Sequence, residues 1–331
     1  MNTPTMQALL LDSVAAPFRL AETPRPVPAA GQALIRIHAS GVNPLDTKIR
    51  AGAAAHARHP LPAILGIDVA GVVEDVGPGT EGFARGDEVY GMVGGVGGIQ
   101  GTLAEYAAVD AALLARKPAN LSMREAAALP LITITAWEGL VDRAKVDAGQ
   151  RVLVQGGAGG VGHIAIQVAR AFGAEVFATD RGNGEDLIRS LGATPIDVRN
   201  ANAEDYVAAY TAGRGFDLVY DTIGGAALDA SFAAVRKFGH VVSCLGWGSH
   251  SLAPLSFKGA TYSGVFTLMP LLTGEGRWHH GDILAKAAKL VEAGKLKPHL
   301  DPRHFTLDTA ADAHDAIMDR SAKGKLVVSV A

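Results

Sequence analysis

Residues Arg151 to Gln167 read RVLVQGGAGGVGHIAIQ, and this stretch decides the fold. The short apolar run Val152–Val154 leads into five glycines within seven positions, and apolar residues then recur at helical spacing. So many glycines between two ordered segments indicate a tight turn from a strand into a helix. Because the first N–H groups and the dipole of such a helix attract a diphosphate, the stretch predicts a dinucleotide cradle.

The glycines Gly156, Gly159 and Gly162 follow a GxxGxxG spacing instead of the more familiar GxGxxG. The context is the one that the motif requires, since a strand precedes the turn, a helix follows it, and a second strand ends near Asp180. The alternative is a tight turn without a ligand. A second glycine-rich segment, Gly91–Gly101, is not followed by a helical pattern, and we expect a mobile loop there. The predicted contacts to the diphosphate are Gly156, Ala158, Gly159, Gly160, Val161 and Gly162.

Two charged residues at the end of the second strand bear on the choice of cofactor. A carboxylate at Asp180 can accept hydrogen bonds from the adenosine ribose, which favours NAD. The neighbouring Arg181 can pair with a 2′-phosphate, which favours NADP. A third interpretation makes both residues solvated charges of a turn.

Length and composition set the class of protein. The chain has 331 residues, enough for about two domains, with 48% apolar and 19% charged residues. A net charge of −3 gives no electrostatic footprint for a nucleic acid, and no apolar run approaches the length of a membrane span. The opening residues MNTPTMQALLLDS lack the features of a secretory signal, and Cys244 is the only cysteine. We therefore expect a cytoplasmic protein without internal disulfides.

The order of expected elements predicts two kinds of domain. Short strands at Ala33–His38, Asp68–Val76 and Asp87–Met92 indicate a β-rich, barrel-like first third. In the middle third strands alternate with helices, which is typical of a parallel doubly wound sheet. The last third contains a helix over Asp282–Ala293 and a final strand over Leu326–Val330, which we expect to rejoin the first domain. Further strands are predicted at Glu175–Ala178, Ile196–Val198, Phe216–Ile223, His240–Leu245 and Tyr262–Met269, and helices at Asp186–Leu191, Ala226–Phe238 and Ala310–Arg320.

Taken together, these features resemble the medium-chain dehydrogenase/reductase superfamily and, within it, the zinc-free quinone oxidoreductase-like branch. The resemblance runs nearly end to end and is specific for the fold when its segments are combined. It rests on SGVNPLDTKIRAG (40–52), LGIDVAGVVEDVG (65–77), FARGDEVYG (83–91), GTLAEYAAV (101–109), LPLITITAWEGL (129–140), GGAGGVG (156–162) and GKLVVSV (324–330).

The resemblance implies an α/β protein with two domains. A GroES-like, β-rich substrate domain would take residues 1–122, and a Rossmann cofactor-binding domain would take residues 123–268. A C-terminal segment, residues 269–331, would return to the substrate domain. Relatives form homodimers through the edge of the Rossmann sheet, where Tyr262–Met269 is the matching strand.

The zinc-dependent members of the superfamily differ from this chain at their metal ligands. Asn43 stands where they have a cysteine, and Gly66-Ile67-Asp68 stands where they have Gly-His-Glu. The third ligand and the cysteine-rich lobe of the structural zinc are also missing. Since asparagine and isoleucine cannot replace a thiolate and an imidazole in a tetrahedral site, we expect no zinc.

Without a metal, the resemblance implies hydride transfer from NAD(P)H to a quinone or an α,β-unsaturated carbonyl compound. Asn43 would donate its amide to a carbonyl or to the nicotinamide carboxamide, and Thr135 would lie near the nicotinamide. Asp46 would order the loop, and Lys48 would donate a proton or a hydrogen bond to the enolate or quinol oxygen. Lys48 replaces a tyrosine of some relatives, which puts its role in doubt. The alternatives are that Asn43 and Asp46 stabilise the turn around Pro44 and that Lys48 is a solvated helix residue.

The resemblance also places a second set of residues against the cofactor. Cys244 could be a reactive thiol, but packing as a buried residue is favoured because nothing nearby in the sequence lowers its pKa. Phe266, Met269 and Trp278 form either an apolar substrate wall or core and dimer contacts. The cofactor set on this side is Cys244, Leu245, Gly246, Phe266 and Thr267.

Three functions remain open from the sequence. The first is a zinc-independent reductase of quinones or enones that uses NADP(H) or NAD(H), with a lean towards NADPH. The second is an enoyl-thioester reductase, which the lack of a tyrosine between Asn43 and Gly52 disfavours. The third is a cofactor-binding sensor or structural protein with little turnover. The expected partners are a small molecule and a second copy of the chain.

Overall fold

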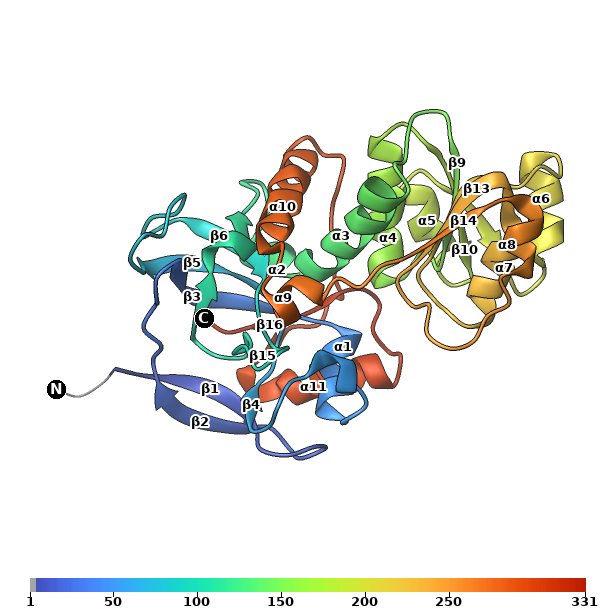
Figure 1. Ribbon diagram of the computed structural model, residues 1–331. Coiled ribbons are helices and arrows are strands. Elements are labelled where there is room, and N and C mark those ends of the chain that lie inside the picture. The colour runs from blue at the N-terminus through green and yellow to red at the C-terminus, as the bar shows by residue number, and fades with distance from the viewer. Residues whose placement is uncertain (1–3) are drawn as a thin grey trace. The chain divides into compact units, whose positions relative to one another are not determined.

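The structure of the protein, a computed structural model, describes residues 4–331 (Figure 1). The chain divides into two compact units. Unit 1 runs up to Leu131 and also takes Leu268–Gly294 and Pro298–Ala331, whereas unit 2 comprises Ile132–Thr267 and Lys295–Lys297. Among the described residues, no helix has both the length and the apolar character needed to cross a bilayer. The domain limits expected from the sequence, after residues 122 and 268, stay a prediction.

Unit 2 is built on a six-stranded parallel sheet with the order β11-β10-β9-β12-β13-β14. This order corresponds to the 3-2-1-4-5-6 arrangement of a doubly wound dinucleotide-binding fold, so the predicted fold class is confirmed. Helices connect most of the strands (Figure 1). The strands are β9 (Arg151–Gln155), β10 (Glu175–Asp180), β11 (Thr194–Asp197), β12 (Phe216–Asp221), β13 (Val235–Ser243) and β14 (Thr261–Gly264). The helices are α4 (Gly160–Ala171), α5 (Glu185–Ser190), α6 (Ala203–Thr211), α7 (Ala226–Ala234) and α8 (Ala253–Lys258).

Three predicted elements of unit 2 differ from the structure by four residues or more at one end. The strand predicted over His240–Leu245 begins earlier, at Val235. The helix predicted over Ala226–Phe238 ends at Ala234, because Val235 begins β13 and pairs with Phe216. β-branched residues such as valine favour a strand that packs against its neighbour. The strand predicted over Tyr262–Met269 ends at Gly264, and Met269 begins helix α9, in which Pro270 occupies the first turn.

Unit 1 contains a seven-stranded sheet and a three-stranded sheet. In the larger sheet β3 is central: β5 lies along one edge of it, and β16 and β7 share the other. The smaller sheet has the order β2-β1-β4. The strands are β1 (Thr5–Leu11), β2 (Arg19–Pro24), β3 (Gln32–Val42), β4 (Ala63–Ile64), β5 (Asp68–Val76), β6 (Glu88–Met92), β7 (Tyr106–Asp110), β8 (Leu114–Arg116), β15 (Phe305–Thr306) and β16 (Leu326–Ser329). The helices are α1 (Pro44–Arg50), α2 (Met123–Ala127), α9 (Met269–Thr273), α10 (Arg277–Glu292) and α11 (Ala310–Met318), and α3 (Pro130–Trp137) begins here and continues in unit 2.

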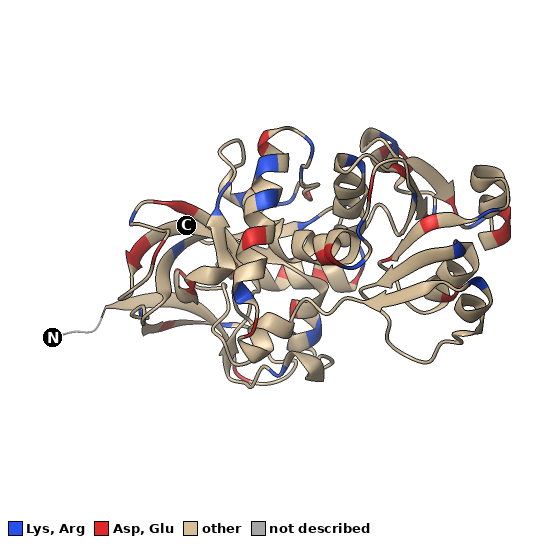
Figure 2. Ribbon diagram, turned by 45° about the horizontal axis from the view of Figure 1, so that its top comes forward, with Lys and Arg blue, Asp and Glu red and all other residues tan. Residues whose placement is uncertain are grey.

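The C-terminal strand returns to unit 1, as expected. In the antiparallel pairing of β16 with β3, Leu326 lies opposite Val42 and Val328 opposite Ser40. Charged residues of both signs are interspersed over the ribbon, and this view shows no continuous basic stripe (Figure 2).

Candidate functional site

The predicted cofactor residues of unit 2 gather at the carboxyl edge of its parallel sheet. The glycine turn follows β9, Asp180 ends β10, and Cys244 follows β13. Adjacent strands connect these points, since Thr222, just after β12, donates a hydrogen bond to the carbonyl of Gln155 at 2.7 Å. In doubly wound sheets this edge is the usual place for a dinucleotide.

At three of its glycines the turn has no room for a side chain. Gly156 has φ +76°, and a Cβ atom there would lie 2.9 Å from the side chain of Ile223. A Cβ on Gly162 would lie 2.0 Å from the carbonyl oxygen of Gly156, and one on Gly157 would lie 2.5 Å from Cβ of Ala178. These contacts bring the first turn of α4 tightly against the end of β9. The first N–H groups of α4 have no acceptor within their own helix, which leaves them for a bound anion.

Asp180 has a role within its own turn. Its Oδ2 accepts hydrogen bonds from the backbone N–H groups of Asn183 and Gly184, both at 2.7 Å. The carboxylate therefore shapes the loop after β10, and this leaves Oδ1 for a ribose hydroxyl. Arg181 beside it is exposed.

Sequence reasoning missed a second cation at this loop, Arg199. Its guanidinium packs over Gly182, where a Cβ atom would meet Nη2 at 1.9 Å, and it pairs with Asp197 at 2.8 Å. The charge of Asp180 adds to the effects that raise the pKa of Arg199, after the hydrogen bond and charge of Asp197. Arg199 follows β11, the strand that pairs with β10. Only this pairing of strands could have indicated that Arg199 lies near Asp180.

The segment after β13 is held by the buried Asp221. Ser243 donates from its hydroxyl to Asp221 Oδ2 at 2.7 Å and accepts the N–H of Leu245 at 3.0 Å. Burial, and secondarily the charge of Asp221, raises the pKa of the Cys244 thiol to about 12. A thiol with such a pKa is a poor nucleophile, which favours packing over chemistry, but Cys244 is half-buried and not fully buried as expected. A Cβ atom at Gly246 would lie 2.2 Å from the hydroxyl of Tyr262, so a side chain there would require the partly exposed Tyr262 ring to move.

Thr135 and Thr267, predicted from two distant segments, lie together in unit 2. Their hydroxyl oxygens are 3.1 Å apart, and Thr267 also donates to Glu138 at 3.2 Å. Thr135 is held from the other side, because the hydroxyl of Tyr220 donates to its backbone carbonyl at 2.7 Å. Next to Thr267, the ring of Phe266 meets Trp247 edge to face, with centroids 6.2 Å apart. Thus the structure brings these two threonines into one polar contact.

Unit 1 contains a second group of functional candidates, a buried polar cluster formed by Asn43, Asp46, Asp68 and Lys325. All four side chains are at most 6% exposed. Strand pairing explains how they meet: Gly41 of β3 lies opposite Asp68 of β5, and Val42 lies opposite Leu326 of β16. Asn43 and Lys325 each lie one residue beyond these last partners, so all these chain segments converge where β3 ends.

Hydrogen bonds join the cluster into one network. Asn43 donates from Nδ2 to Asp68 Oδ2 at 2.9 Å, and its Oδ1 accepts from Lys325 Nζ at 2.5 Å. Its backbone N–H donates to Asp46 Oδ2 at 2.8 Å, which secures the first turn of α1. Asp68 Oδ1 accepts the N–H of Leu131 at 2.9 Å. Asp46 Oδ1 has no hydrogen-bond partner among the described residues.

Burial dominates the ionisation of the cluster. It raises the pKa of Asp46 to about 7 and that of Asp68 to about 6, although Lys325 lowers both. The backbone N–H groups of Asn43 and Gly66 oppose the shift at Asp46. Burial also lowers the pKa of Lys325, whereas the charges of Asp68 and Asp46 raise it. Hence the cluster can take up or lose a proton near neutral pH.

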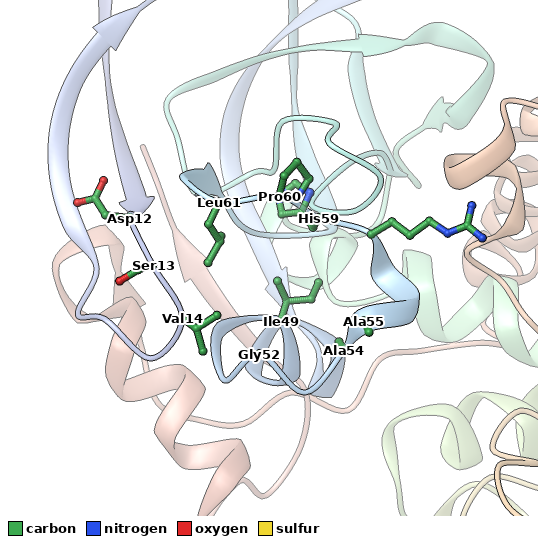
Figure 3. Close-up of a pocket in the computed structure, with 11 residues that line it drawn as sticks. Asp12, Ser13, Val14, Ile49, Gly52, Ala54, Ala55, His59, Pro60 and Leu61 are labelled. Carbon is green, nitrogen blue, oxygen red and sulfur yellow. The ribbon is translucent and has the colours of Figure 1, made fainter.

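Lys48 lies on the exposed face of α1, whereas Asp46, Thr47 and Ile49 are buried. A cavity of about 800 Å³ lies at the C-terminal end of the same helix (Figure 3). Its wall is mostly apolar, and the imidazole of His59 borders it. The lining residues are Asp12, Ser13, Val14, Ile49, Gly52, Ala54, Ala55, Arg58, His59, Pro60 and Leu61.

The donor set at Asn43 does not fit a zinc ion. The lone pair of Asn43 Oδ1 faces the Lys325 ammonium, and Ile67, fully buried, offers no ligand atom. No group of three or more His, Cys, Asp or Glu side chains within residues 4–331 could hold a metal. We therefore derive no chemical step through zinc.

Comparison with known proteins gives the family. Residues 29–119 match the model of the alcohol dehydrogenase GroES-like domain, and residues 191–328 match that of the zinc-binding dehydrogenases. The NADPH-dependent alkenal/one oxidoreductase of Arabidopsis thaliana is 38% identical over 90% of this chain and 72% of its own length. The human quinone oxidoreductase is 31% identical over 92% of this chain and 90% of its own length.

A solved structure extends the match to the whole chain. An alcohol dehydrogenase superfamily protein from Novosphingobium aromaticivorans is 60% identical with a TM-score of 0.97, over 99% of this chain and 100% of that one. The order of strands, the glycine turn and these matches agree. The chain therefore belongs to the medium-chain dehydrogenase/reductase superfamily, among the relatives of quinone oxidoreductases and alkenal/one reductases.

Proposed function

We propose that the protein transfers hydride from NADPH or NADH to quinones or α,β-unsaturated carbonyl compounds without a catalytic zinc. The observation that carries this proposal is the locked amide of Asn43, with an ammonium group at the atom that would have to bind a metal. A cation at this point disfavours a second one by direct repulsion. The names of the relatives support the class of acceptor.

The residues of unit 2 fit the cofactor. The turn from Gly156 to Gly162 would hold the diphosphate, and Asp180, Arg181 and Arg199 would surround the adenosine ribose. When bound, the nicotinamide supplies a hydride. The protein supplies orientation and polar contacts, and the hydroxyl groups of Thr135 and Thr267 are candidates for those contacts.

The proposed acceptors suit a site whose donor atoms do not fit a Lewis-acidic zinc ion. A quinone or an enone delocalises the charge that hydride addition creates onto its oxygen, so hydrogen bonds suffice to stabilise it. The Lys48 ammonium, which is exposed on α1, can then deliver a proton from Nζ. The apolar cavity beside Ile49 and Leu61 offers a volume suited to a small organic acceptor.

The test is a cofactor titration followed by an acceptor screen. NADPH and NADH are titrated by fluorescence, and their oxidation is then followed with quinones, enals, enones, enoyl thioesters and saturated ketones. We expect turnover with quinones or enones that dialysis against a chelator leaves unchanged. Turnover with enoyl thioesters alone would favour that alternative, whereas micromolar cofactor binding without turnover would favour a sensor.

A cavity-filling variant tests the site of the acceptor. Ala55 is exposed and lines the cavity, so Ala55→Trp should raise the KM for the acceptor about fivefold and leave the cofactor Kd unchanged. Ala53→Trp is the matched control, since Ala53 is also exposed, is close in sequence and lies outside the lining set. Equal KM values for the two variants would place the acceptor elsewhere.

We also propose that the protein is cytoplasmic and forms a homodimer. Cell fractionation would test the location, and light scattering would test the dimer.

A further inference from the structure

Lys325 is an unusual residue for the interior of a protein. It is 6% exposed, and it lies at the last step before β16, 282 positions from Asn43. Its ammonium donates to two neutral acceptors, the backbone carbonyl of Val42 at 2.9 Å and Oδ1 of Asn43 at 2.5 Å. A buried ammonium is costly unless opposite charges compensate for it, and here Asp68 and Asp46 do so.

The two charges determine which way the Asn43 amide points. The ammonium of Lys325 faces the carbonyl end, and the carboxylate of Asp68 faces the NH2 end. A flipped amide would place its NH2 group against an ammonium and its oxygen against a carboxylate. Since both contacts would become repulsive, the charges hold the amide in one orientation.

We propose that Lys325 is a positioning residue, which together with Asp68 clamps the Asn43 amide and so holds the first turn of α1. Asn43 precedes α1, and its backbone N–H meets Asp46 within that turn. Through this clamp the C-terminal tail supports the segment that carries Lys48. The catalytic consequence of the clamp rests on the proposed reductase function, but the clamp itself does not.

The surroundings of the cluster define its response to substitution and pH. The charged groups at this position are Asp46 from α1, Asp68 from β5 and Lys325. The neighbouring polar groups are neutral: the hydroxyls of Ser40 and Thr102 form a hydrogen bond of 2.6 Å, and Thr102 donates to the backbone carbonyl of Asp68. Removing only the ammonium leaves two buried carboxyl groups, which then favour the protonated form more strongly. The loss of stability should therefore grow as pH rises above 6. Removing the ammonium and the Asp68 charge together should cost less, because no uncompensated pair remains.

The experiment compares Lys325→Met, Asp68→Asn and the double variant with wild type and with Lys323→Met. Lys323 is an exposed lysine two positions away on the same tail, so it is the matched control. Thermal unfolding and initial rates are measured from pH 6 to 8.5. We expect K325M to lower Tm by about 10 °C at pH 8 and the double variant to recover at least half of this shift.

The kinetic readout separates positioning from mere folding. For K325M we expect kcat per folded molecule to fall at least tenfold, most at high pH, with the KM of the cofactor unchanged and partial recovery in the double variant. A kcat equal to that of K323M, or strictly additive effects of K325M and D68N on stability, overturns the inference. If K325M does not fold, a folded double variant supports the clamp and an unfolded one contradicts it. If wild type turns over no acceptor, the proposed function fails, while the unfolding data still decide on the clamp.

Discussion

The glycine turn of unit 2 and the polar cluster of unit 1 are assembled in opposite ways. The turn takes its parts from seven consecutive residues, 156–162, whereas the cluster joins Asn43, Asp46, Asp68 and Lys325 from segments spread over nearly the whole chain. In the turn, backbone N–H groups would bind the diphosphate, and glycines leave space for the close contacts. In the cluster, buried charged side chains hold one another in place. Consequently, a single substitution within the turn should severely weaken cofactor binding. The polar cluster should be disrupted only by substitutions that change its balance of charges.

The largest effect is expected at the glycine turn. In Gly162→Ala the added Cβ atom would lie 2.0 Å from the carbonyl oxygen of Gly156, so the helix must move away from β9. We expect the Kd of the cofactor to rise on the order of 100-fold, equivalent to about 3 kcal/mol. Fluorescence titration measures this change. Gly264→Ala is the control, because a Cβ atom there meets nothing within 4 Å; equal Kd values for both variants would refute the steric account.

The choice between NADPH and NADH should change by about tenfold at the end of β10. Asp180→Asn keeps an oxygen for the N–H groups of Asn183 and Gly184 and removes the charge, so it should favour NADPH over NADH by about 1.4 kcal/mol. Arg181→Ala and Arg199→Ala should shift the ratio of the two Kd values in the other direction. If Asp180→Asn weakens both cofactors equally, Asp180 only caps its turn.

The buried polar cluster should make the free energy of unfolding depend on pH. The pKa of Asp46 is raised from 3.8 to about 7, so the folded state keeps a proton that the unfolded state releases. This contribution to stability is complete below about pH 4 and is lost as pH rises to about 7. Asp46→Asn should flatten the slope in this window by up to about 1.4 kcal/mol per pH unit. Urea unfolding at several pH values measures the slope. Asp12→Asn, at an exposed residue, is the control, and an unchanged slope in Asp46→Asn would argue against a protonated Asp46.

The smallest effect is expected at Cys244. Since its pKa is raised to about 12, about one thiol in ten thousand is ionised at pH 8. Cys244→Ala should keep kcat/KM within about twofold of wild type, and native protein should resist iodoacetamide, as judged by mass spectrometry. Denatured protein is the positive control. Rapid alkylation of the native protein would restore the thiol as a candidate for chemistry.

Much of the fold could be predicted because its signals are local. The alternation of strands and helices predicted the parallel sheet, and the β5 strand over Asp68–Val76 was predicted with its observed limits. The end of α7 was mispredicted, because the apolar run through Val235 suits a helix or a buried strand equally well. Pairing with β12 decides between them.

Some residues of the candidate sites could likewise be predicted from the sequence, and others could not. The resemblance pointed to Asn43 and Asp46, but nothing near them in the sequence indicates Lys325, whose partners arrive through the pairing of β16 with β3. Arg199 was missed because its neighbour Gly182 belongs to another strand–loop segment.

The sequence by itself determined the class of fold, the glycine turn and the loss of the zinc ligands, since each depends on neighbouring residues or on residue types. The tertiary structure decided which charges are buried together and how far their pKa values shift. The physical reason is that a pKa and an ion pair depend on distance and burial in space, and strand pairing sets both between residues that are hundreds of positions apart.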